Sequence, residues 1–139
     1  MISQNSFEHF NDPVEILNEM KSLINDTGKI IITFGPPWYA PYGSHMHFFC
    51  KIPWVHVLFS EKAVMTVRKH FRDDHMMTYV DAGMNKMTIS KFEHLIESID
   101  LKIVFKRYKC IKGLDLLSKI PYLREFFINH VSVLLEKSN

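Results

Sequence analysis

The chain of 139 residues has the length of one domain, which excludes a second full domain. Apolar residues make up 47% and charged residues 23%, and this balance excludes a disordered tail, a collagen-like repeat and a coiled coil. The net charge is only +2, so electrostatic attraction to nucleic acid or anionic lipid is weak, and we expect no nucleic-acid partner.

Apolar runs and cysteine spacing indicate the cellular setting. The longest apolar run, residues 46–59, is interrupted by Lys51 and Pro53, so we expect no membrane span. The first residues show neither the basic start nor the apolar centre of a signal peptide. Cys50 and Cys110 lack the spacing of a zinc finger, and two free thiols are typical of a reducing cytosol. We therefore expect a cytoplasmic protein.

The first predicted element is an amphipathic helix that begins at Asp12. Asp12 is a favourable N-cap, and Pro13 suits the first helical position. Apolar residues then recur at the spacing of one helix face, at Val14, Leu17, Met20 and Ile24. We expect Gly28 to end the helix in the left-handed conformation that glycine tolerates.

A short apolar strand is predicted over residues 29–34. Its apolar side chains do not alternate with polar ones, which is typical of a strand in a parallel sheet with helices above and below. Such a strand needs a neighbour at each edge. A later hairpin can cover one edge, but only residues 1–6 precede the first helical segment. We therefore expect an exposed apolar edge beside Ile30–Phe34.

The second half of the chain predicts a loop, two helices and two strands. Residues 36–59 have little periodicity and predict a long structured loop. Residues 60–70 and 90–99 predict helices, the first capped by Ser60 and the second by a capping box of Ser90 and Glu93.

The last two predicted strands alternate apolar and polar side chains. They cover residues 101–108, with Leu101, Ile103 and Phe105 on one face, and residues 130–136. Between them, residues 113–128 predict short helices broken at Pro121. We expect an α/β domain whose parallel sheet ends in an antiparallel hairpin.

The order of these elements resembles the C-terminal half of one enzyme family. Glu8-His9 and Asp12-Pro13 precede the first helix, and Gly28 leads into the apolar strand Ile30–Phe34. This order is similar to that of class I S-adenosylmethionine-dependent methyltransferases of the type 11-like group. The resemblance implies the C-terminal part of a Rossmann-like sheet, in which an antiparallel last strand is inserted beside the buried strand. It also implies that residues 36–59 form the substrate-side loop.

The resemblance also implies that the domain of residues 1–139 is incomplete. In this family the cofactor rests mainly on a glycine-rich turn after the first strand, whereas the five glycines here are dispersed. At about 30 residues per βαβ unit, roughly 100 residues of N-terminal sheet are absent. We expect a fragment, a mis-started gene product or a truncated relative, and we expect the chain to be inactive alone.

The resemblance assigns candidate site residues before the first helix. Ser3, Gln4 and Asn5 would run past the methionine end of S-adenosylmethionine. Glu8 and His9 would be catalytic, taking the proton from the attacking nucleophile. The alternative interpretation is that these two residues bond backbone amides at the helix entry.

The substrate-side loop contributes the remaining candidates. Trp38, Tyr39, His45 and His47 would line the site of a small-molecule acceptor. Its aromatic residues would equally serve as core anchors. His45, His47 and Cys50 are residue types that bind metal ions. No second pair of such residues has a matching spacing, so we expect no metal site.

Three functional hypotheses follow. The first is S-adenosylmethionine-dependent methyl transfer, with this chain supplying the substrate loop and part of the cofactor wall. The second is a non-catalytic interaction module that pairs its open sheet edge with a partner chain or with the missing N-terminal half. The third is a small metal-dependent enzyme built on His45, His47 and Cys50.

Overall fold

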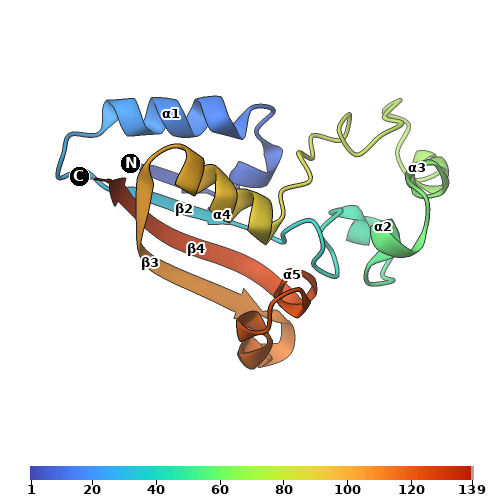
Figure 1. The fold of residues 1–139 in the computed structure, drawn as a ribbon. Coiled ribbons are helices and arrows are strands. Elements are labelled where there is room, and N and C mark those ends of the chain that lie inside the picture. Colours follow the sequence, from blue (N-terminus) through green and yellow to red (C-terminus); the bar gives the residue numbers. More distant parts are fainter. Residues whose placement is uncertain (139) are drawn as a thin grey trace.

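The computed structural model describes residues 1–138 and contains one four-stranded sheet. Figure 1 shows that the sheet is open and has helices beside it. The α/β class is confirmed in this mixed form. The strands are β1 (Ile2–Gln4), β2 (Ile30–Phe34), β3 (Leu101–Cys110) and β4 (Ile128–Lys137). The α-helices are α1 (Pro13–Leu23), α2 (Val55–Leu58), α3 (Glu61–Lys69), α4 (Ile89–Ser98) and α5 (Leu123–Phe127). Short 3-10 helices are η1 (Phe7–His9), η2 (Met46–Phe48), η3 (Ile111–Gly113) and η4 (Asp115–Lys119).

The sheet combines one parallel pair with an antiparallel end. Its strand order is β1-β2-β4-β3, in which β1 and β2 are parallel and β4 runs antiparallel to both of its neighbours. The last strand of the chain therefore lies between β2 and β3. This confirms the predicted antiparallel hairpin and the short helices that connect its strands.

The expected exposed edge beside β2 is wrong, because the first residues of the chain cover it. Ile31 donates its backbone N–H to the Met1 carbonyl at 2.9 Å, and Asn5 donates to the Thr33 carbonyl at 2.7 Å. Six residues are enough for one short strand. Within residues 1–138 the sheet instead ends at β1.

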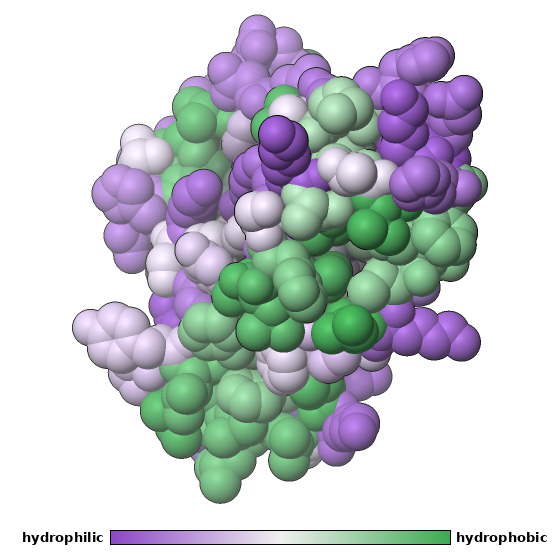
Figure 2. All heavy atoms as spheres, turned by 90° about the vertical axis from the view of Figure 1, so that its right-hand side faces the viewer, coloured by the Kyte–Doolittle hydropathy of each residue, from purple (hydrophilic) through white to green (hydrophobic). Residues whose placement is uncertain are grey.

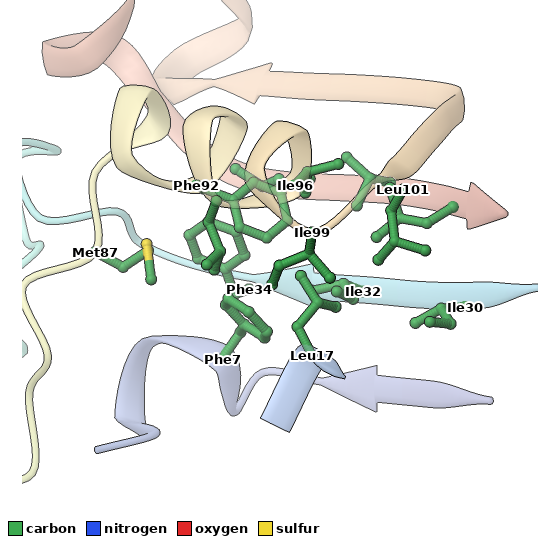
Figure 3. Packing of buried hydrophobic residues seen from close by; sticks show 14 of the residues in the cluster. Phe7, Leu17, Ile30, Ile32, Phe34, Met87, Phe92, Ile96, Ile99 and Leu101 are labelled. Atoms are coloured by element: carbon green, nitrogen blue, oxygen red, sulfur yellow. The ribbon is translucent and has the colours of Figure 1, made fainter. Parts of the chain in front are cut away.

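One face of the sheet carries the main core. Figure 3 shows Leu17 of α1 and Phe92 and Ile96 of α4 around the inward side chains of β2, all in one cluster. We call this the helix face. The prediction that β2 is buried on both faces is wrong, since Ile32 is fully buried while Ile31 is 39% exposed on the opposite face. Both helices thus lie on the same side of the sheet.

The opposite face, which we call the outer face, carries a row of apolar side chains across all four strands. Ile2 pairs with Ile31, Ile31 with Leu134, and Leu134 with Phe105. The strict alternation expected for β3 fails at a bulge after Ile103, which moves Phe105 to this face. Phe105 is 55% exposed and Ile2 67% exposed.

Helix α1 begins as predicted but ends earlier. The Asp12 carboxylate accepts the Glu15 N–H at 2.9 Å, and Pro13 occupies the first helical position. The helix ends at Leu23, and Gly28 does not adopt a left-handed conformation, so its predicted capping role is wrong. Gly28 is required for space, because a Cβ there would lie 2.7 Å from that of Ile24.

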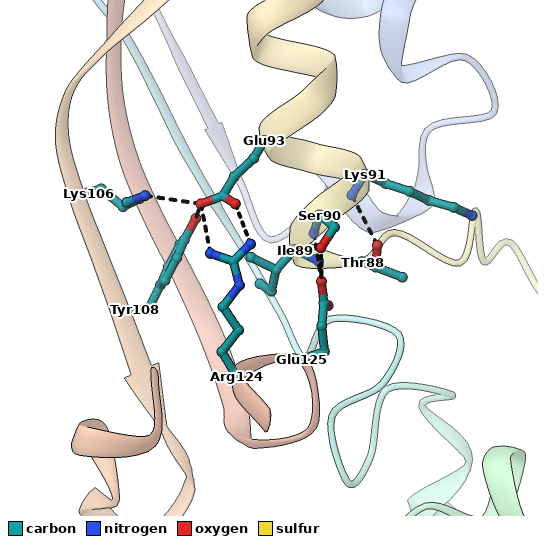
Figure 4. A network of polar contacts seen from close by, with 9 residues as sticks. All are labelled: Thr88, Ile89, Ser90, Lys91, Glu93, Lys106, Tyr108, Arg124 and Glu125. Carbon is teal, nitrogen blue, oxygen red and sulfur yellow. Dashed lines mark hydrogen bonds and ion pairs between the residues drawn. The ribbon is translucent and has the colours of Figure 1, made fainter. Parts of the chain in front are cut away.

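Helix α3 has the predicted cap and α4 does not. Ser60 caps α3 by accepting the Ala63 N–H. The capping box at Ser90 is wrong, because Thr88 is the N-cap of α4. Figure 4 shows that Glu125 of α5 accepts from the first N–H groups of α4, at Ile89 (2.9 Å) and Ser90 (2.8 Å).

Glu93, the other expected member of the capping box, joins α4 to the strand hairpin instead. Its carboxylate accepts from the Tyr108 hydroxyl at 2.6 Å and from Arg124 at 2.6 Å, and Lys106 lies 3.0 Å away (Figure 4). Burial alone would raise the pKa of Glu93, but these three donors lower it. Burial and the nearby carboxylate raise the pKa of Tyr108.

A second, smaller core forms beneath the long loop. Its buried members come from the loop, from α2 and α3 and from the segment before α4: Met46, Val55, Val64, Met65, Tyr79 and Met84. Cys50 and Cys110 are both free, as expected. None of the helices described within residues 1–138 has the length and apolar character needed to cross a lipid bilayer.

Candidate functional site

The candidate site lies beyond the carboxyl ends of the parallel strands. Helix η1, with Glu8 and His9, follows β1 directly, and Gly35 follows β2. Open α/β sheets place their ligands at this end of the strands. The long loop returns to the same end and brings two further histidines.

A pocket of about 420 Å³ opens beside His9. It is enclosed by η1, by the loop around η2, by the end of α3 and by the segment before α4. Its lining residues are His9, Ser44, His45, Met46, His47, Phe48, Arg68, Arg72, Ala82 and Met84. We call it the histidine pocket. It unites three of the residues that the sequence proposed, namely His9, His45 and His47.

The tautomer of His9 is fixed by one hydrogen bond. Its Nδ1 lies 2.8 Å from the carbonyl oxygen of Gly83. Because a carbonyl only accepts, Nδ1 carries the proton, and in the neutral ring Nε2 keeps its lone pair. This arrangement equips His9 to accept a proton through Nε2.

Asn85 holds the backbone that carries His9. Its side-chain amide donates to the carbonyls of Phe7 (2.8 Å) and Phe10 (3.0 Å), while its backbone N–H donates to the Glu8 carbonyl at 3.0 Å. The Asn85 side-chain oxygen accepts the Met87 N–H at 3.0 Å. Two segments far apart in the sequence are thus joined around the candidate base.

His45 lies against His9 in an unusual backbone conformation. Its φ is 57°, in the left-handed region, and its ring stands edge-to-face with that of His9 at 5.2 Å. Burial, reinforced by the nearby rings of His9 and His47, lowers its pKa to about 4. His45 is therefore neutral at pH 7. Its Nε2 is buried and has no hydrogen-bond partner among the described residues.

Two arginines supply positive charge to the histidine pocket. Arg68 is buried and forms a two-pronged ion pair with Asp74, which lowers the pKa of that carboxyl group. Arg72 lies with its guanidinium carbon 4.3 Å from the centre of the Phe48 ring. No carboxylate belongs to the pocket lining within the described part of the chain.

Glu8 faces a different environment from His9. Its side chain is 2% exposed, and Oε1 accepts the Gly35 N–H at 3.3 Å. This contact is of the kind that the backbone-amide alternative anticipates. Oε2 is buried and has no partner within residues 1–138. The carboxylate therefore bridges the ends of β1 and β2 rather than lining the histidine pocket.

The three residues proposed to border the cofactor lie along β1 and its end. Ser3 is buried, and its hydroxyl has no hydrogen-bond partner among residues 1–138. Gln4 and Asn5 are exposed, and Asn5 has a left-handed φ of 49°. The buried polar atoms Ser3 Oγ and Glu8 Oε2 are both unpaired near this end of the sheet.

Trp38 and Tyr39 are not brought into the histidine pocket. Trp38 packs edge-to-face on His56 at 4.7 Å and on Tyr79 at 4.9 Å, beside the second core. Tyr39 rests on Phe126 of α5, with ring centres 5.6 Å apart. Both contacts anchor the long loop.

A second cavity of about 250 Å³ has an almost wholly apolar lining. It lies between α2 and α3 and is lined by Phe49, Cys50, Ile52, Val55, Phe59, Ala63, Val64, Val67 and Phe71. Figure 2 views this side of the molecule, where apolar side chains gather in a connected area bordered by hydrophilic ones. Cys50 thus belongs to the apolar cavity, whereas His45 and His47 line the histidine pocket. Within residues 1–138, no three His, Cys, Asp or Glu side chains are grouped to hold a metal ion.

Sequence reasoning missed Arg68 and Arg72. Arg68 lies in α3, whereas Arg72 follows the end of that helix at Lys69. No helical spacing in the sequence therefore indicated that both line one pocket. In comparisons with known proteins, the chain matches no family model and no curated protein sequence.

Proposed function

We propose that this chain forms the C-terminal half of a class I methyltransferase with a Rossmann-like sheet. In this proposal the complete enzyme transfers a methyl group from S-adenosylmethionine to a small-molecule acceptor. The observation that supports it most strongly is the strand order β1-β2-β4-β3, with one parallel pair and an antiparallel last strand inserted beside β2. The order and sense of these strands agree with what the sequence resemblance implies.

The residues present fit part of a cofactor site. Ser3 Oγ and Glu8 Oε2 are buried and unpaired near the end of β1, as expected where a polar ligand or further protein completes the structure. Gln4 and Asn5 would border the methionine end, but no glycine-rich turn for the nucleotide lies in this chain. When bound, S-adenosylmethionine supplies an activated methyl group.

The role proposed for the chain's own residues centres on His9. A hydroxyl or amine nucleophile must lose its proton during the transfer, and Nε2 of His9 keeps a lone pair that can take it. His45 and His47 would line the acceptor site, and Glu8 would position η1 by bonding to Gly35. The free thiols support the proposal of a cytoplasmic setting.

The test begins with the protein as it exists in its native cells. Its intact mass and first residue define the polypeptide, which is then assayed for S-adenosylmethionine binding by calorimetry and for transfer of labelled methyl groups. We expect binding and transfer by the native form, and transfer falling at least 100-fold in His9→Gln with cofactor affinity unchanged. The control is His75→Gln, an exposed histidine outside the pocket. A native form that does not bind the cofactor would overturn the proposal.

The second candidate function is a non-catalytic interaction module. The apolar row of Ile2, Ile31, Leu134 and Phe105 on the outer face favours it, because exposed apolar patches mark interaction surfaces. Recovery of one defined partner in a stoichiometric complex from native cells, without methyl transfer, would support this alternative.

A further inference from the structure

We propose that the histidine pocket binds the anionic group of an organic acceptor, a carboxylate or a phosphate ester, with an apolar ring or chain attached. This inference rests on the proposed function in treating the ligand as the methyl acceptor. The binding itself requires no cofactor, because the pocket is formed by this chain alone.

The charges around the pocket favour an anion. Among its ten lining residues, three are histidines and two are arginines, and none is acidic. Asp74 neutralises Arg68 from beside the pocket. No ion pair joins Arg72 to any carboxylate within residues 1–138, so one full positive charge remains available to a ligand.

Arg72 is also held in a suitable geometry. Its guanidinium carbon lies 4.3 Å from the centre of the Phe48 ring, which is the distance of a cation–π contact. An aromatic ring engages the guanidinium without occupying its N–H donors, so they remain free to bind two oxygens of one anion. Phe48 thereby reduces the side-chain freedom that Arg72 would lose on binding.

The remaining lining residues indicate which chemical groups accompany the anionic group in the ligand. Met46, Phe48, Ala82 and Met84 offer apolar surface for a ring or chain. The ring of His45 also lines this pocket, and its Nε2 atom is buried. A hydroxyl or amine on the same ligand could donate to Nε2 of His9. The geometry therefore favours an acceptor that combines an anionic group with a nucleophilic O–H or N–H.

The test is a titration of the chain, without cofactor, followed by ¹⁵N and histidine ring NMR signals. The probes are benzoate, phenyl phosphate and, as the neutral counterpart, benzyl alcohol. We expect at least one anion to bind in the pocket at least 10-fold more tightly than benzyl alcohol, with affinity that falls as salt increases. Tighter binding of benzoate assigns a carboxylate, and tighter binding of phenyl phosphate assigns a phosphate ester.

Variants separate a built site from general attraction to a basic protein. Arg72 is exposed, so Arg72→Gln is expected to fold, and we expect it to weaken anion binding at least 10-fold. Phe48→Leu should weaken it less, by removing the ring under the guanidinium. The control is Arg107→Gln, an exposed arginine on the outer face of β3, which should bind like the wild type.

Three outcomes would overturn the inference: equal affinity for the anions and benzyl alcohol, an unchanged affinity in Arg72→Gln, or an equal loss in Arg107→Gln. Its failure is distinguishable from failure of the proposed function. Anion binding by a protein that shows no methyl transfer would support the anion site and overturn the proposed methyltransferase function. Methyl transfer to neutral acceptors alone would support the proposed function and overturn the anion site.

Discussion

Protonation of His45 is expected to destabilise the fold in mildly acidic solution. Its pKa is lowered from an ordinary 6.5 to about 4 by burial and by the neighbouring imidazoles. Between these two values the unfolded chain binds a proton that the folded chain excludes. The stabilisation is therefore fully present above about pH 6.5 and is lost as the pH falls toward 4.

The size of the effect follows from the two pKa values. Linkage gives a loss of at most about 2 kcal/mol between pH 7.5 and pH 5 from this one side chain. That is a large share of the 5–15 kcal/mol typical of a domain. The lowered pKa values of Glu93 and Glu136 change the stability mainly below about pH 4.5. Because the lower pH of the comparison is 5, these two carboxyl groups contribute little to the measured difference.

The assay is urea unfolding at pH 7.5 and pH 5 for the wild type and for His45→Asn. Asparagine tolerates the left-handed backbone and carries no titrating group in this range. We expect the wild type to lose about 2 kcal/mol more than the variant over this interval. His75→Asn is the matched control, since His75 is also left-handed (φ 58°) but exposed, and its loss should equal that of the wild type. Equal losses in His45→Asn and the wild type would refute the reasoning.

Three further predictions concern the supports of the site and sheet. Asn85→Ala removes three side-chain hydrogen bonds and should cost about 2–4 kcal/mol in urea unfolding, against less than about 0.5 for the exposed Asn18→Ala; similar values would contradict the anchoring role. Ile32→Ala should cost about 3 kcal/mol and Ile31→Ala about 1 or less, because only the first empties the core; a reversed order would contradict the assignment of faces. Glu125→Ala should cost about 1–2 kcal/mol and accelerate hydrogen exchange at the first amides of α4, and unchanged exchange would speak against capping.

Patterns among residues close in sequence predicted the helices and strands more reliably than they predicted the contacts between those elements. The cap at Asp12 and the alternation of the last strand depend on residues close in sequence, and both were correct in the structure. Ser90 failed as a cap because Glu125, 35 positions away, satisfies the first N–H groups of α4. The predicted face of Phe105 was wrong because a bulge shifts the register of β3, and the periodicity of the sequence does not reveal a bulge.

The candidate site was predictable only in part, for a similar reason. The position of His9 after a strand and the His45-x-His47 spacing indicated residues that the fold brings together. Trp38 has the same aromatic character as a ligand-binding residue, yet packing against Tyr79 draws it away from the pocket. Arg72 was missed because its availability depends on Asp74 pairing with Arg68 instead.

The bond from Glu125 to α4 has a consequence for the route by which the chain reaches its native state. Glu125 lies in the connection between β3 and β4, so its carboxylate reaches α4 only after that connection has closed. A ten-residue helix is marginal in isolation. We therefore expect α4 to acquire lasting protection together with the hairpin, late and cooperatively, although its residues are synthesised first.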